Sequence, residues 1–157
     1  MAEEQVKLLK SMKEAAAKSI QKPYSKIDQI GIVVEDVEKT TKFLQEAFGI
    51  GPFSTIEEEG EWGKSKISTV LLGELQIELI QNSVMGWKEG KQHLAFYVED
   101  IEKELAKLKK QGIGVLKRGN VLGLVEWAYL DTEKDSGTVL ELIQLTPLAD
   151  DMLKGSG

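Results

Sequence analysis

An internal duplication limits the possible folds of this 157-residue chain more than any other feature of its sequence. The segment VEDVEK at 34–39 returns almost letter for letter as VEDIEK at 98–103. A second pair follows in the same order, because IELIQ at 77–81 matches LELIQ at 140–144. We therefore expect one compact domain that contains two similar modules.

Each copy of the repeat begins with an apolar strand and continues into a helix. The strands are predicted at 27–34 and 93–98, and Asp36 and Asp100 are suited to cap the helices that follow. Three more strands follow each helix, so that each copy is β-α-β-β-β. These strands are predicted at 53–58, 66–72 and 75–81 in the first copy, and at 114–117, 125–132 and 138–145 in the second.

One helix covers only one face of such a sheet, and two copies can turn their uncovered faces toward each other. The predicted fold class is α+β, with paired βαβββ modules that form a cupped, barrel-like mixed sheet and an extra N-terminal helix. The predicted divisions are an amphipathic helix in residues 1–25 (over 2–21), a single domain over 26–146 with modules at 26–82 and 91–146, and a C-terminal tail at 147–157 with a disordered end.

The composition excludes several classes of function. A net charge of −6 and a single arginine, Arg118, argue against nucleic acid as a partner. No apolar run approaches the roughly 18–20 residues of a membrane span, and the acidic N-terminus differs from a secretory signal. The absence of cysteine excludes disulfides and thiolate chemistry. We expect a cytoplasmic protein that binds neither membranes nor nucleic acid.

Four polar residues occupy matched positions in the two copies. Gln29 and His93 lie in the first strands, and Glu78 and Glu141 lie in the last strands. Burying a carboxylate is costly unless it is paired or bound to a metal. One imidazole nitrogen and three oxygen ligands suit a divalent metal, which predicts a metal site. The alternatives are a structural histidine and glutamates that lie at an edge or interface.

Aromatic residues are candidates for an apolar substrate pocket. Trp87 lies in the linker 82–90, which is the natural mouth of a site between the copies, and Trp127 and Tyr129 lie in a predicted strand. Core packing is the alternative role for such side chains.

The phrases IDQIGIVVEDVEK, FGIGPF, GKQHLAFYVED and YLDTEKDSGTVLELI resemble the vicinal oxygen chelate superfamily. That group includes glyoxalase I, methylmalonyl-CoA epimerase, extradiol dioxygenases and drug-resistance binding proteins. The resemblance covers residues 26–145 and implies the paired βαβββ fold. It also implies a divalent metal ion (Zn, Ni, Co or Mn) held by Gln29, Glu78, His93 and Glu141.

The sequence segments are similar to those of methylmalonyl-CoA epimerase, whereas the ligand set Gln, Glu, His, Glu is that of the zinc-type glyoxalase I. Asn82 matches an asparagine that holds glutathione in glyoxalase I and is therefore a candidate for substrate binding. Val33 and Glu89 stand where that enzyme has arginines for glutathione. The separate carboxylate base of the epimerase has no counterpart near Ser68 and Thr69.

The resemblance implies a metal-dependent isomerase or lyase that abstracts a proton next to the carbonyl of a small thioester or thiol-adduct substrate. Glu141 is the first candidate for the base and Glu78 the second. The alternative is a non-catalytic, drug-sequestering binding protein of the same fold. An extradiol dioxygenase is disfavoured, because a two-histidine iron site cannot be built from one histidine. We expect a homodimer, and either one chain or two neighbouring chains can supply the paired modules.

Overall fold

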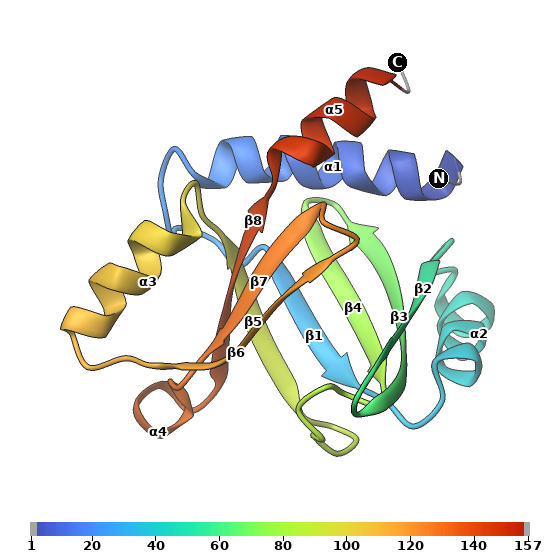
Figure 1. Ribbon diagram of the computed structural model, residues 1–157. Coiled ribbons are helices and arrows are strands. Elements are labelled where there is room, and N and C mark those ends of the chain that lie inside the picture. Colours follow the sequence, from blue (N-terminus) through green and yellow to red (C-terminus); the bar gives the residue numbers. More distant parts are fainter. Residues whose placement is uncertain (1–2, 156–157) are drawn as a thin grey trace. The chain divides into compact units, whose positions relative to one another are not determined.

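The computed structural model describes residues 3–155 and divides the chain into two compact units (Figure 1). Residues 29–93 form the continuous unit, and the described residues 3–28 together with 94–155 form the split unit. The start of the predicted helix at residue 2 and the last two residues of the predicted tail lie outside the described residues. The predicted single domain over 26–146 stays a prediction.

The continuous unit is a βαβββ module. It contains β1 (Gln29–Val33), α2 (Val37–Phe48), β2 (Ser54–Gly60), β3 (Gly63–Leu72) and β4 (Leu75–Gln81). The strand order is β2-β3-β4-β1, in which β1 runs parallel to β4 and the other neighbours are antiparallel. A parallel and two antiparallel pairings make this a mixed sheet, as predicted.

Two side chains fix the start of α2. The carboxylate of Asp36 accepts a hydrogen bond from the backbone N–H of Lys39 at 3.1 Å, as expected of an N-cap. The backbone N–H of Val37 donates to Oε1 of Gln81 at 2.9 Å. The helix ends at Gly49, whose φ of 70° is the left-handed conformation that favours glycine at this position.

The split unit repeats the βαβββ order and adds helices. Its strands follow the order β5-β8-β7-β6. Asp100 caps α3 through the N–H of Lys103 at 3.1 Å, and the N–H of Ile101 donates to Oε1 of Gln144 at 2.8 Å. The elements are α1 (Glu3–Ser19), β5 (Gln92–Tyr97, whose first two residues belong to the continuous unit), α3 (Ile101–Lys110), β6 (Val115–Val121), β7 (Val125–Leu130), α4 (Glu133–Ser136), β8 (Val139–Leu145) and α5 (Pro147–Gly155).

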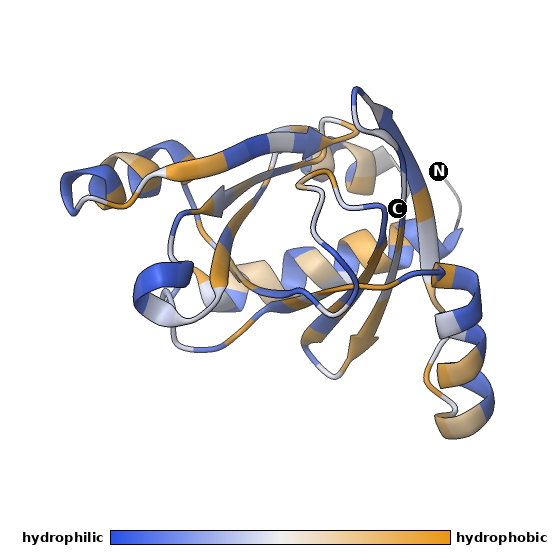
Figure 2. Cartoon of the chain, turned by 90° about the horizontal axis from the view of Figure 1, so that it is seen from below, coloured by the Kyte–Doolittle hydropathy of each residue, from blue (hydrophilic) through white to orange (hydrophobic). Residues whose placement is uncertain are grey.

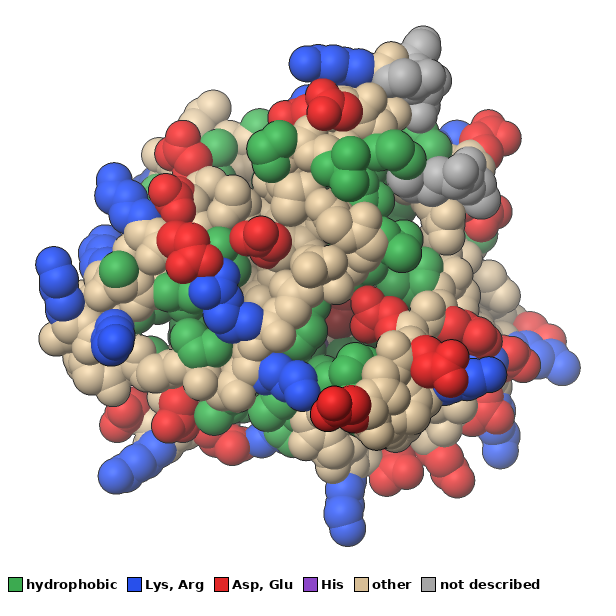
Figure 3. Space-filling model, viewed as in Figure 1, with side chains coloured by type: hydrophobic (Ala, Val, Ile, Leu, Met, Phe, Trp, Pro, Cys, Tyr) green, Lys and Arg blue, Asp and Glu red, His purple; other side chains and the backbone are tan. Residues whose placement is uncertain are grey.

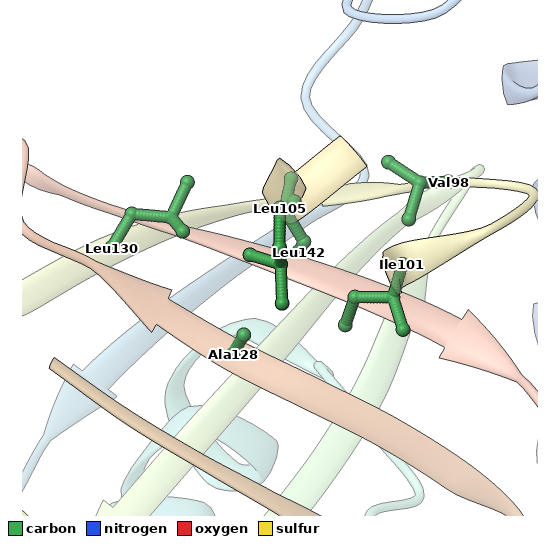
Figure 4. Close-up of a cluster of buried hydrophobic side chains, with 6 residues drawn as sticks. All are labelled: Val98, Ile101, Leu105, Ala128, Leu130 and Leu142. Carbon is green, nitrogen blue, oxygen red and sulfur yellow. The ribbon is translucent and has the colours of Figure 1, made fainter. Parts of the chain in front are cut away.

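The core of the split unit lies between α3 and the sheet (Figure 4). The apolar stripe of α3 packs on side chains from β7 and β8, and all six members of the cluster are buried. Removing this much apolar surface from water is the main favourable term in folding. The members are Val98, Ile101, Leu105, Ala128, Leu130 and Leu142.

A second layer joins α1 and α5, which lie side by side in the split unit (Figure 1). Met12 and Ala15 of α1 pack on Ala95 and Tyr97 of β5. Leu9 packs on Ala149 of α5. The predicted amphipathic N-terminal helix therefore covers the sheet with its apolar face.

Asp28 ties the end of α1 to β5. It is almost fully buried, and its carboxylate accepts hydrogen bonds from the Ser19 hydroxyl at 2.5 Å and from the N–H of Tyr97 at 2.9 Å. Its own N–H donates to the carbonyl of Ala95 at 3.0 Å. These bonds satisfy a buried carboxylate that would otherwise be costly.

The two βαβββ modules and the additional N-terminal helix confirm the predicted fold class. Two elements were not predicted: the short α4, and α5 in the segment predicted as a tail. The predicted disordered end is the segment 154–157, and its first two residues, Lys154 and Gly155, belong to α5. Ala149 packs α5 against α1, a partner far away in sequence. Acidic and basic side chains both occur over the face viewed in Figure 3. No helix within residues 3–155 has the length and apolar character to cross a membrane.

Candidate functional site

His93 lies against the backbone of β1 in the continuous unit. It is 0% exposed, and a Cβ added to Gly31 would meet its Cε1 atom at 2.0 Å. The imidazole therefore occupies the space that any side chain at position 31 would need. Glycine in the interior of a strand often marks such a close approach, and here it makes room for the only histidine of the chain.

Gln29 and Glu78 lie beside that imidazole on the same face of the sheet. The β1–β4 register places Gly31 opposite Glu78, and side chains two residues apart in a strand share a face. Nε2 of Gln29 donates to Oε2 of Glu78 at 3.3 Å. Oε1 of Gln29 is buried and has no hydrogen-bond partner within residues 3–155. Three of the four predicted ligands are thus brought together within one compact unit.

Two further polar residues share this face. Gln76 lies opposite Gln29 in the β1–β4 register, and Thr69 lies opposite Glu78 in the β3–β4 register. Both side chains are buried. Neither residue is among the predicted site residues, although the period of two that places Glu78 on this face also places Gln76 there.

The segment that precedes β5 carries Trp87 and is bound to β1. The N–H of Val33 donates to the carbonyl of Lys91 at 2.9 Å, and the N–H of Gly90 donates to the carbonyl of Val33 at 2.9 Å. The ring centroid of Trp87 is 6.0 Å from that of His93, and the Lys91 ammonium is 5.8 Å from the Trp87 centroid. Trp87, predicted to bind substrate, therefore lies beside the histidine.

Asn82, the other predicted substrate residue of this unit, takes part in a local network. Its Nδ2 donates to the carbonyl of Lys64 at 2.7 Å, and its carbonyl accepts from the Ser65 hydroxyl. Trp62 Nε1 donates to the same Ser65 hydroxyl at 2.8 Å. These contacts tie the residue after β4 to the start of β3, and the substrate role of Asn82 stays a prediction.

Glu141 lies in the split unit with the two remaining aromatic candidates. It is 5% exposed, and the β7–β8 register places it opposite Tyr129. The rings of Trp127 and Tyr129 are 5.0 Å apart, and Trp127 covers Gly119 much as His93 covers Gly31. Side chains two residues apart in a strand share a face, so Trp127 lies on the same face as Tyr129 and its partner Glu141. The predicted base therefore lies beside an aromatic pair.

The side chains of the continuous unit fit a divalent metal in their donor chemistry. No three His, Cys, Asp or Glu side chains within residues 3–155 are grouped as potential metal ligands. The amide oxygen of Gln29 supplies an oxygen donor of another kind, because it is buried and accepts no hydrogen bond from the described residues. Together with the imidazole of His93 and the carboxylate of Glu78, it makes a mixed nitrogen and oxygen set.

A family model described as "Glyoxalase/Bleomycin resistance protein/Dioxygenase superfamily" matches residues 28–130. The chain belongs to this superfamily. The match covers the continuous unit and the first part of the repeat in the split unit, and it confirms the family resemblance of the sequence. None of the curated proteins compared with the chain matches it.

Solved structures of methylmalonyl-CoA epimerases are similar to this superfamily member. One, in complex with methylmalonyl-CoA and NH4+, is 22% identical with a TM-score of 0.63 over 77% of this chain and 94% of the other. A Streptomyces coelicolor epimerase variant with 2-nitronate-propionyl-CoA is 22% identical, with a TM-score of 0.64 over 78% and 95%. The Mycobacterium tuberculosis epimerase is 17% identical, with a TM-score of 0.64 over 80% and 91%. At these identities the likeness concerns the fold.

Proposed function

We propose that this superfamily member is a metal-dependent isomerase or lyase that moves a proton next to the carbonyl of a small thioester or thiol-adduct substrate. The observation that carries the proposal is the group formed by Gln29, Glu78 and His93 on one face of the continuous unit. The amide oxygen of Gln29 is buried and accepts no hydrogen bond from the described residues, which is costly unless a ligand satisfies it, and a buried imidazole and a partly buried carboxylate lie beside it. The likeness to an epimerase that holds methylmalonyl-CoA supports a thioester.

In this proposal Gln29, Glu78, His93 and Glu141 hold a divalent ion of the Zn, Ni, Co or Mn group. The bound ion would supply a positive charge that polarises the substrate carbonyl. Gln29 already orients the Glu78 carboxylate through its amide N–H, which leaves its amide oxygen available as a donor. Gly31 leaves the space beside β1 that the imidazole occupies.

The chain's own side chains would carry the proton. Glu141 accepts the proton from the carbon next to the carbonyl and returns it to the same or the neighbouring carbon, so that no other reactant is consumed. Its buried position beside Tyr129 limits access of bulk water. Glu78 is the second candidate for this role. Trp87, Trp127 and Tyr129 are proposed to contact the apolar part of the substrate.

Metal content and proton exchange test the proposal in two steps. Elemental analysis of purified protein, before and after incubation with Zn, Ni, Co or Mn, is expected to find about one ion per chain. Exchange of solvent deuterium into CoA thioesters and thiohemiacetals then tests proton transfer. Glu141→Gln is expected to abolish exchange and to retain the fold, and full exchange in that variant removes Glu141 as the base.

Gly31→Ala tests the histidine position without changing any donor atom. The added methyl group overlaps the imidazole, so His93 must move. A displacement of about 1 Å at a reacting centre can cost on the order of 100-fold in rate, and we expect at least that loss together with weaker metal binding. The matched control is Ala95→Gly at the duplicated position in β5, which is expected to retain metal binding.

The second candidate function is a non-catalytic binding protein of the same superfamily. The aromatic pair Trp127 and Tyr129, whose rings are tilted by 48° to each other, favours it, because aromatic side chains suit planar apolar ligands. Absence of metal after incubation with all four ions, combined with binding of an aromatic ligand followed by tryptophan fluorescence, would decide for this alternative.

A further inference from the structure

Strands β7 and β8 have helix α3 on one face and the candidate site residues on the other. Ala128 and Leu142 belong to the cluster beneath α3. Neighbouring residues of a strand point to opposite faces, so Trp127, Tyr129 and Glu141 lie on the face away from α3. We call this the site face of the split unit. It carries the proposed base and the two aromatic side chains of this unit that are proposed to contact substrate.

Helix α1 covers one end of the site face (Figure 1). Met12 belongs to a buried cluster with Ile143 of β8, and Val125 of β7 packs against that cluster. Side chains two residues apart in a strand share a face, so Ile143 lies on the face of Glu141. Trp127 lies directly opposite Ile143 in the β7–β8 register. The apolar side of α1 therefore ends where the candidate site residues begin.

The spacing between α1 and the proposed base is short. Ile143, which packs with α1, is separated from Glu141 by a step of two residues, about 7 Å along the strand. Trp127 at the boundary is only partly buried, so part of its ring can be reached by a ligand. A substrate that reacts at Glu141 and extends toward Ile143 therefore meets α1 after a short distance.

Contacts along its length hold α1 in place. Leu9 packs on α5, and the Lys13 ammonium lies 2.6 Å from the carboxylate of Asp150 in the same helix. At the other end, the Ser19 hydroxyl donates to the buried carboxylate of Asp28 at 2.5 Å. Figure 2 shows hydrophobic residues at intervals along α1, as expected of a helix with one apolar side. The helix is thus a fixed boundary of the site face.

Helix α1 is an addition to the part of the chain that the superfamily shares. The superfamily model begins to match at residue 28, whereas α1 ends at Ser19. The proton transfer proposed above uses no side chain of α1. A fixed apolar helix beside a reacting group is suited to decide which substrates fit rather than what reaction they undergo.

We propose that α1 limits the length of the acyl chain that the site accepts, and that Met12 is the specificity-determining residue. This inference rests on the proposed function and narrows its substrate class to short-chain acyl thioesters. Met12 is the larger of the two buried side chains that α1 contributes to the cluster, the other being Ala15. A longer acyl chain has to displace the Met12 side chain, and a packed core resists the insertion of extra methylene groups.

Dissociation constants of straight-chain CoA thioesters test this limit on the full-length protein. The probes are acetyl-CoA, butyryl-CoA and octanoyl-CoA, and binding is followed by tryptophan fluorescence. One methylene group in an apolar pocket is worth roughly 10–200-fold in discrimination, so we expect butyryl-CoA to bind at least 10-fold more tightly than octanoyl-CoA. Exchange of solvent deuterium into the same thioesters gives a second length profile.

Met12→Ala is expected to reduce the preference for butyryl-CoA over octanoyl-CoA by about 10-fold or more. Leu9→Ala is the matched control, because Leu9 is buried to a similar extent in the same helix, at 5% exposed against 8% for Met12, and packs on α5. It is expected to lower stability and to retain the wild-type length preference. Met12→Val serves if Met12→Ala does not fold, with a smaller shift in the same direction.

Several results would overturn the inference. They are a wild-type protein that binds none of the three thioesters, one that binds octanoyl-CoA as well as butyryl-CoA, and a length preference that Met12 variants leave unchanged or that Leu9→Ala changes equally. Length-dependent binding without deuterium exchange would contradict the proposed function and retain the role of α1. Exchange whose length profile is the same in wild type and Met12→Ala would do the reverse.

Discussion

The two modules begin their helices in the same way and then differ in how they use them. In both, an aspartate caps the helix and a glutamine from the last strand binds the first helical N–H. Helix α3 packs Ile101 of its first turn and Leu105 of its second turn into a closed apolar cluster (Figure 4). In α2, Val37 is the only buried residue, and the aromatic residues are largely exposed.

The first strands show the same contrast. Gly31 of β1 makes room for an imidazole, whereas Ala95 at the matched position of β5 is buried beside α1. The features that both modules keep satisfy backbone groups at a helix end, which every helix requires. The features that differ are side-chain spaces and surfaces. The shared helix-end hydrogen bonds therefore maintain the module, whereas the side-chain spaces and surfaces are particular to each copy.

The largest expected effect concerns the helix cores. Ile101→Ala is expected to lower the free energy of unfolding by about 2–5 kcal/mol, because it leaves a cavity in the cluster beneath α3. Val37→Ala at the matched position of α2 removes about two buried methyl groups and is expected to cost roughly 1.6 kcal/mol. Urea denaturation measures both. Equal losses would contradict the view that α3 is the better packed helix.

A smaller and equal effect is expected from the shared glutamines. Gln81→Leu and Gln144→Leu each leave a helical N–H without its acceptor, which costs about 1–3 kcal/mol. Because the two bonds differ by only 0.1 Å in length, the losses are expected to agree within about 0.5 kcal/mol. The exposed Gln45→Leu serves as the control in the same denaturation series. If the two variants lost clearly different amounts of unfolding free energy, the two glutamine bonds would not contribute equally to the stability of the modules.

The smallest effect belongs to a contact that only the second module has. Burial, with a further contribution from the Glu104 carboxylate, raises the pKa of Tyr24 to about 12. The folded state thus retains the phenolic proton where the unfolded chain loses it, so the stabilisation is complete below pH 10 and is lost as the pH rises toward 12. The first module has Thr40 in place of Glu104.

Tyr24→Phe removes this titration. The stability difference between wild type and Tyr24→Phe is expected to shrink from pH 9 to pH 11.5, by a modest amount because the ring is nearly half exposed. Comparing the two proteins cancels the titration of lysines in the same range. A difference that stays constant with pH would remove Glu104 as the partner of this hydroxyl.

The repeated helices and strands could be predicted because each is signalled by residues that lie close together in the sequence. Asp36 and Asp100 indicated where both helices begin, and the alternation of β4 indicated the face of Glu78. The space beside Gly31 could have been predicted in the same way, since a glycine in an apolar strand often marks a close approach of another group. It was not predicted because the sequence near Gly31 does not show which side chain packs against it.

Helix α5 could not be predicted for a different reason. Its nine residues are too few to be helical without a partner, and that partner is α1, at the opposite end of the sequence. The roles of the predicted site residues depend likewise on a bound ligand, and they stay predictions until metal and exchange are measured. Sequence patterns report local order well and distant partners poorly.

The division into a continuous unit and a split unit has a consequence for synthesis. Residues 29–93 contain β1, β2, β3 and β4, which are neighbours in the strand order, so these four strands can pair with one another before the rest of the chain is made. Met12 and Ala15 of α1 can be covered once Ala95 and Tyr97 are made, whereas Leu9 stays uncovered until Ala149, more than a hundred residues later, has been added to the chain. During that interval part of the apolar face of α1 is exposed, and exposed apolar surface is what chaperones bind during translation.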